Sequence, residues 1–118
     1  MIAVIFEVVP HAEHRLDYLD TAANLRPHLE QIDGFISIAR FESLSQPGKV
    51  LSLSFWRDKA AVQQWRTLEI HRQSQTAGRG HIFADYRLPV AAVLRDYGLF
   101  EREQAPQESR QIHGGKIT

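Results

Sequence analysis

The sequence predicts an α+β fold of the ferredoxin-like, split β-α-β kind, with a four-stranded antiparallel sheet and helices on one face. Strand-like and helix-like segments follow one another in the order strand, helix, strand, strand, helix, strand. The length of 118 residues suits one domain with one core. Because the strand-like segments are apolar on both faces, the sheet face without helices needs a cover. We expect an identical sheet from a second copy, which makes a homodimer.

The first third of the chain predicts one strand and one interrupted helix. Residues 2–9 are almost continuously apolar, which is typical of a strand covered on both faces, and Pro10 ends it. A helix starts at His11, and Pro27 is expected to break it near Arg26, because proline cannot continue the hydrogen-bond ladder unstrained. A second short helix then carries the chain to the Asp33-Gly34 stop. The apolar positions at helical spacing are Ala12, Leu16, Leu19, Ala23, Leu25, Leu29 and Ile32.

The middle of the chain predicts a β-hairpin. Residues 35–44 and 49–56 have strand composition, and the turn residues 45–48 separate them. Side chains alternate between two faces along the second strand. One face carries Leu51, Leu53 and Phe55, and the other carries Ser52, Ser54 and Trp56. The small serines would leave room for a cavity under a helix.

A second helix, a last strand and a tail follow the hairpin. Asp58 is a natural N-cap for a helix that runs toward Gly78 and Gly80. The apolar stripe of this helix comprises Ala61, Val62, Trp65 and Leu68. After the helix, residues 83–97 fit a long strand that Pro89 would bend or bulge.

Composition divides the chain and narrows its function. Residues 1–100 form the expected domain, and residues 101–118 are so polar that a flexible tail is expected. Fourteen basic and fourteen acidic side chains give no net charge, which argues against nucleic acid or a membrane surface as partner. The absence of cysteine excludes disulfides, thiolate nucleophiles and sulfur-ligated metals. A cytoplasmic location is the expectation.

The segment FWRDKAAVQQW at residues 55–65, followed by His71 and by Gly-Arg-Gly at residues 78–80, resembles the antibiotic biosynthesis monooxygenase (ABM) family. The resemblance covers residues 1–100 in element order. It implies a dimeric α/β barrel with one pocket per subunit between the sheet and the two helices. It also implies, for some members, cofactor-free oxygenation of aromatic polyketides, while other members degrade haem or isomerise small molecules.

The residues of the best-known family activities are only partly present. Haem-degrading members resemble this chain in having Trp65, but they carry an Asn and an iron-ligating His where this chain has Glu7 and Gln75. The quinone-forming oxygenases pair the Trp with an Asn one turn earlier, where this chain has Ala61. The leading interpretation is a cofactor-independent monooxygenase for a small aromatic or quinone-like substrate. A non-catalytic or stress-related dimer that binds a small hydrophobic ligand is the alternative, and haem binding or degradation is the third.

Trp65 and His71 are the candidate catalytic residues. Trp65 would form a pocket wall, although a large aromatic on an apolar stripe usually packs in the core. His71 could take a proton from a phenolic substrate, and a structural or surface histidine is the alternative. The two positions lie about 240° apart around a continuous helix, so a shared cavity requires a break between Thr67 and Glu69.

Five further residues are candidates for substrate binding. Tyr86 or Arg72 could stabilise a developing oxygen charge, and His28 could lie at the pocket mouth. Glu7 would be either a pocket acid or part of an ion pair at the dimer interface. No metal site is expected, because His11 and His14 lack a third ligand at a helical offset. The substrate-binding candidates are Glu7, His28, Arg72, Gln75 and Tyr86.

Overall fold

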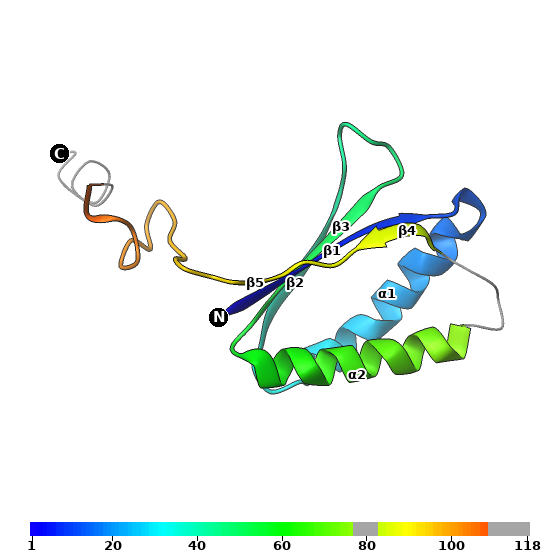
Figure 1. Ribbon diagram of the computed structural model, residues 1–118, viewed down its shortest axis with the longest axis horizontal. Coiled ribbons are helices and arrows are strands. Elements are labelled where there is room, and N and C mark those ends of the chain that lie inside the picture. Colours follow the sequence, from blue (N-terminus) through cyan, green and yellow to red (C-terminus); the bar gives the residue numbers. More distant parts are fainter. Residues whose placement is uncertain (77–82, 109–118) are drawn as a thin grey trace.

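The computed structural model describes residues 1–76 and 83–108, and the side chains of residues 1–68 and 83–108 (Figure 1). A single 3₁₀ turn at Ala12–His14 precedes the first helix. The strands are β1 (Ile2–Pro10), β2 (Phe35–Glu42), β3 (Val50–Trp56), β4 (Phe83–Arg87) and β5 (Val90–Ala92), and the helices are α1 (Arg15–Glu30) and α2 (Lys59–Thr76).

All pairings in the sheet are antiparallel, and the strand order is β2-β3-β1-β4. The strand β5 pairs with the start of β1, while β4 pairs with its end. Both helices lie on the same side of the sheet (Figure 1), and the other side, called the open face below, has no helix of this chain in the described residues. The predicted α+β fold with helices on one face is therefore confirmed.

The predicted hairpin of β2 and β3 is confirmed, together with the two faces of β3. The backbone N–H of Ser43 donates to the carbonyl of Lys49 at 2.9 Å, and Gly48 takes a φ of +90° in the turn. The side chains that face the helices are buried and those that face away are half-buried. Ser52 and Ser54 therefore lie on the helix-covered face, as the alternation predicts.

The predicted break in the first helix near Arg26 is wrong, because α1 continues through Pro27 to Glu30. Pro27 lies in the last turn, where its missing N–H removes one hydrogen bond of the helix, and the next apolar residue, Leu29, is fully buried. Burying such a leucine contributes about 1.5–3 kcal/mol, which is comparable with the cost of about 3 kcal/mol for an interior proline.

The buried face of α1 also differs from the predicted one. The predicted core residue Leu16 is 74 % exposed. The buried positions are Tyr18, Ala22, Leu25 and Leu29. They are spaced by four, three and four residues and so form one stripe along the helix. Leu25 and Leu29, the longer aliphatic side chains of the C-terminal half, direct this stripe toward the sheet.

The predicted last strand is split and shorter than expected. Pro89 interrupts it between β4 and β5, as predicted, and its carbonyl accepts the N–H of Ile5 at 2.9 Å. The strand ends at Ala92 rather than at Tyr97, and the chain then leaves the body of the domain (Figure 1). The predicted glycine stop after α2 and residues 109–118 of the predicted tail lie outside the described residues.

Candidate functional site

Two apolar clusters occupy the helix-covered side of the sheet. The tyrosine cluster lies under the first half of α1 and comprises Val8, Tyr18 and Val50, with Phe6, Leu19 and Phe83 packed against it. The tryptophan cluster lies under the second half of α1 and under α2. It comprises Val4, Leu25, Leu29, Ile38, Trp56, Ala61, Val62 and Trp65.

A polar strip separates the two clusters on the sheet surface. Ser52 and Ser54 lie between Val50 of one cluster and Trp56 of the other along β3, and both serines are buried. Arg40 of β2 is the cross-strand partner of Ser52, and Phe6 of β1 is its partner on the other side. We call Arg40, Ser52 and Ser54 the central strip.

Aromatic rings extend the tyrosine cluster toward the sheet edge at β4. The ring centroid of Phe6 lies 5.8 Å from Phe83 and 6.0 Å from Tyr86. Tyr86 is the register partner of buried Val8, and its side chain is 62 % exposed. The central strip is therefore bordered by aromatic surface, the composition typical of sites for amphipathic small molecules.

Trp65 is a core residue of the tryptophan cluster. It is 7 % exposed, and its ring centroid lies 6.4 Å from that of Trp56, whose indole N–H donates to Ser54 Oγ at 2.9 Å. The predicted stripe of α2 is confirmed, since Leu68 also packs against this cluster. Trp65 thus lies next to the strip through Trp56 and Ser54.

The break in α2 that a shared cavity would require is absent. The helix is continuous from Lys59 to Thr76, and Thr67 Oγ1 donates to the carbonyl of Gln63 at 3.1 Å within it. Positions 65 and 71 are therefore separated by about 240° around one helix. The side chains of His71, Arg72 and Gln75 lie outside the described residues.

The other predicted binding residues do not converge. Glu7 follows the alternation of β1 onto the open face, because its neighbour Val8 belongs to the helix-covered tyrosine cluster. Its carboxylate lies 3.7 Å from Lys49 Nζ and 3.9 Å from Arg87 Nη1. His28 is exposed on α1. Of the binding candidates Glu7, His28 and Tyr86, only Tyr86 packs against Phe6, the cross-strand partner of Ser52.

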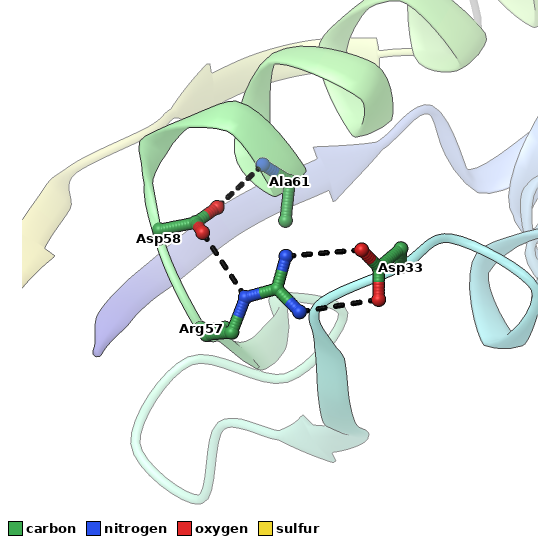
Figure 2. A network of polar contacts seen from close by, with 4 residues as sticks. All are labelled: Asp33, Arg57, Asp58 and Ala61. Atoms are coloured by element: carbon green, nitrogen blue, oxygen red, sulfur yellow. Dashed lines mark hydrogen bonds and ion pairs between the residues drawn. The ribbon is translucent and has the colours of Figure 1, made fainter.

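An ion-pair network fixes the start of α2 against the turn before β2 (Figure 2). The Arg57 guanidinium donates to both oxygens of Asp33 at 3.1 Å and to Asp58 at 3.0 Å. Asp58 also accepts the backbone N–H of Ala61 at 3.0 Å, which confirms the predicted N-cap. The hydrogen bond from Arg57 lowers the pKa of Asp33, and the bond from Ala61 lowers the pKa of Asp58. The network orients the helix that carries Trp65.

Sequence reasoning missed Arg40, Phe6 and Tyr18. A signal for Arg40 was available in the sequence. Arg40 lies two residues after Ile38, and alternate residues of a strand point to the same face, so Arg40 is expected on the same face as this apolar residue. Within the described residues, no three His, Asp or Glu side chains are grouped so that they could hold a metal ion. No helix in that part of the chain is long and apolar enough to span a membrane.

Residues 1–77 match the model of the family described as antibiotic biosynthesis monooxygenase. The chain is 48 % identical over 93 residues to the jasmonate monooxygenase ABM of Pyricularia oryzae. The match covers 79 % of this chain and 43 % of that protein, so the chain spans less than half the length of this relative.

Solved structures share the fold at low sequence identity. A Deinococcus radiodurans protein assigned to the antibiotic biosynthesis monooxygenases has a TM-score of 0.70 at 20 % identity, over 83 % of this chain and 97 % of that one. Rv0793 from Mycobacterium tuberculosis has a TM-score of 0.70 at 18 % identity, over 82 % and 98 %. SnoaB from Streptomyces nogalater, a cofactor-independent oxygenase solved as a mutant, has 0.64 at 10 %, over 80 % and 94 %.

Proposed function

Because this chain belongs to the antibiotic biosynthesis monooxygenase family, we propose that it is a cofactor-independent monooxygenase domain for a small, largely apolar molecule. The observation that carries the proposal is the central strip, where two buried serines and an arginine lie between two aromatic-rich clusters. Such a surface offers apolar contact area together with a few polar groups that can orient a ligand. The bound molecule would lie between the sheet and the helices.

The proposed reaction converts an activated methylene group into a carbonyl. A base removes one proton, the resulting carbanion reduces dioxygen, and a carbon–oxygen bond forms. Cleavage of the oxygen–oxygen bond leaves one oxygen atom on the carbon, and the other departs as water with both methylene hydrogens. The substrate supplies all four electrons, so the balance requires no reductant. In this proposal His71 is the base and acts without Trp65, because α2 is continuous and the two positions lie about 240° apart around it. Tyr86 or Arg72 stabilises negative charge on oxygen.

The name of the relative makes jasmonate the first substrate to test. Jasmonate is a cyclopentanone that carries a carboxylate, and the carbons next to its ketone are acidic enough for a base to activate. Dihydroxynaphthalenes and anthrones represent the aromatic and quinone-like class. The assay measures oxygen uptake without added reductant, and the expected product has gained one oxygen atom and lost two hydrogens. Labelled dioxygen must place its label in that product.

The variant His71→Ala tests the assignment of the base. Loss of a general base is expected to lower the rate by about two orders of magnitude. The matched control is His11→Ala, because His11 is exposed before α1 and far along the chain from α2. Equal rates for the two variants would remove His71 from the mechanism.

A ligand-binding protein without catalysis is the second candidate. Glu7 points to the open face, and Ala61 is 1 % exposed inside the tryptophan cluster, so neither position offers a polar group to the central strip. Ligand binding without oxygen uptake across the panel would favour this candidate. A Soret shift on addition of haemin would instead support the third interpretation, a haem protein.

The homodimer is also part of the proposal. On the open face, Ile5, Leu53 and Phe55 are only half-buried, and Phe41 is 50 % exposed. A second sheet would remove this apolar area from water. Light scattering should give a dimer for the wild type and a monomer for Phe55→Glu. A monomeric wild type would contradict the interface.

A further inference from the structure

Arg40 lies in the middle of β2 on the helix-covered side of the sheet. Ile38, two residues earlier, belongs to the tryptophan cluster, so strand alternation directs Arg40 to the same side. Its cross-strand partner is Ser52, which is 7 % exposed, and opposed side chains of this kind have Cβ atoms about 5 Å apart. The guanidinium of Arg40 and the hydroxyl of Ser52 are therefore neighbours on the helix-covered side of the sheet.

The guanidinium of Arg40 has no acceptor in the described part of the chain. Its Nε is buried and makes no hydrogen bond. By contrast, Arg15 donates to Glu42 at 3.1 Å, and Arg26 donates to Glu30 at 3.1 Å. Buried donors are almost always satisfied, and a charged one without a partner is costly to keep in a fold. An acceptor supplied from outside the chain would explain why this arginine is retained there.

The surroundings indicate which acceptor fits. A guanidinium binds planar, singly charged carboxylates well, because it presents parallel N–H donors. Glu42 lies two residues further along the same face of β2, and although Arg15 pairs with it, its carboxylate disfavours a multiply charged anion such as a phosphate. The rings of Phe6 and Tyr86 lie next along the sheet and offer apolar surface. The complementary ligand has one carboxylate and one apolar body.

We infer that Arg40 and Ser52 form a carboxylate subsite that selects amphipathic small-molecule acids over their neutral esters. The inference deepens the proposed monooxygenase function and rests on it, since it names the substrate class of the same site. Arg40 binds the carboxylate, Ser52 donates a second hydrogen bond to it, and the apolar part lies against the neighbouring aromatic rings.

The test compares acids with their methyl esters. Calorimetry measures binding of jasmonate and methyl jasmonate, and of octanoate and methyl octanoate, to the full chain at neutral pH. The wild type should bind each acid at least about tenfold more tightly than its ester, the value of a charge-assisted hydrogen bond. In Arg40→Met this preference should vanish while ester binding is kept, and Arg40→Lys should retain part of it. The control Arg26→Gln removes an exposed paired arginine and should keep the full preference.

A stability measurement separates ligand binding from a structural role. Replacing the half-buried, unpaired arginine by an apolar side chain of similar length should leave the melting temperature of the free protein unchanged or higher. Added octanoate should then raise the melting temperature of the wild type but not of Arg40→Met. If Arg40→Met folds poorly, a structural role is indicated and the inference fails.

The possible outcomes test the carboxylate subsite and the monooxygenase function separately. Absence of acid preference in both pairs, or its persistence in Arg40→Met, overturns the carboxylate subsite. Oxidation of jasmonate and methyl jasmonate with equal kcat/KM leaves the monooxygenase standing and removes the subsite. An Arg40-dependent preference for octanoate, together with no oxygen uptake for jasmonate or any aromatic substrate of the panel, supports the subsite and contradicts the proposed oxygenase.

Discussion

Replacement of Gly34 by alanine probes the contact between the turn before β2 and the start of α2. Gly34 has a φ of +94°, a region that costs a residue with a side chain about 1–2 kcal/mol. A Cβ at this position would lie 2.8 Å from the Cβ of Ala61, which is 1 % exposed and held by the N-cap at Asp58. Overpacking of this kind costs about 1–3 kcal/mol. Gly34→Ala should therefore lower the free energy of unfolding by about 2–5 kcal/mol.

Gly48→Ala is the matched control for the backbone contribution. Gly48 has a φ of +90°, but a Cβ there would meet nothing within 4 Å. Both variants share the backbone cost and the change in unfolded-state entropy, so their difference isolates the contact with Ala61. That difference should be about 1–3 kcal/mol, which corresponds to a shift of roughly 1 M in the urea midpoint of a domain this size.

Urea titrations at one fixed protein concentration, followed by the fluorescence of Trp56 and Trp65, measure these differences. The double variant Gly34→Ala, Ala61→Gly removes the close contact, so its loss of stability should be smaller than the sum of the two single losses. Equal midpoints for Gly34→Ala and Gly48→Ala, together with additivity in the double variant, would refute the steric reasoning.

Three further predictions concern the core and the ion pairs. Ser54→Ala leaves the buried indole N–H of Trp56 without its acceptor and should cost about 1–3 kcal/mol in urea unfolding, with little change indicating another acceptor. Leu29→Ala should cost about 2–5 kcal/mol, whereas Leu16→Ala should stay within about 0.5 kcal/mol, and comparable losses would contradict the observed phase of α1. A guanidinium lowers the pKa of Asp33 below its ordinary 3.8, so this stabilisation is present above that pH and is lost as the pH falls through the lowered pKa. The difference in urea midpoint between the wild type and Asp33→Asn should accordingly disappear in acid at low salt, and its persistence there would exclude an electrostatic origin.

Local patterns predicted the elements whose cause is local. The turn residues 45–48 predicted the hairpin, and alternation along β3 predicted which of its side chains face the helices. Asp58 predicted the start of α2, and the spacing from Ala61 to Leu68 predicted its buried stripe. Each of these signals depends on a few neighbouring residues, so a single sequence contains them.

The phase and continuity of the helices depended on contacts between distant residues. Pro27 suggested a break in α1, and a cavity shared by Trp65 and His71 would have required one in α2, yet both helices are continuous. Burial of Leu29 against the sheet favours a continuous α1 in spite of the proline. No local pattern weighs a proline against a contact with residues far away in the sequence.

By itself, the sequence determined the order of the elements, the face of β3 that the helices cover, and the resemblance to a family, because periodicity and turn chemistry are local properties. The tertiary structure alone decided which candidate side chains meet. It placed Glu7 on the open face with Lys49 and Arg87, and it placed Arg40 beside Ser52 on the helix-covered face. Strand pairing and register bring such residues together, and these are set by the packing of the whole sheet.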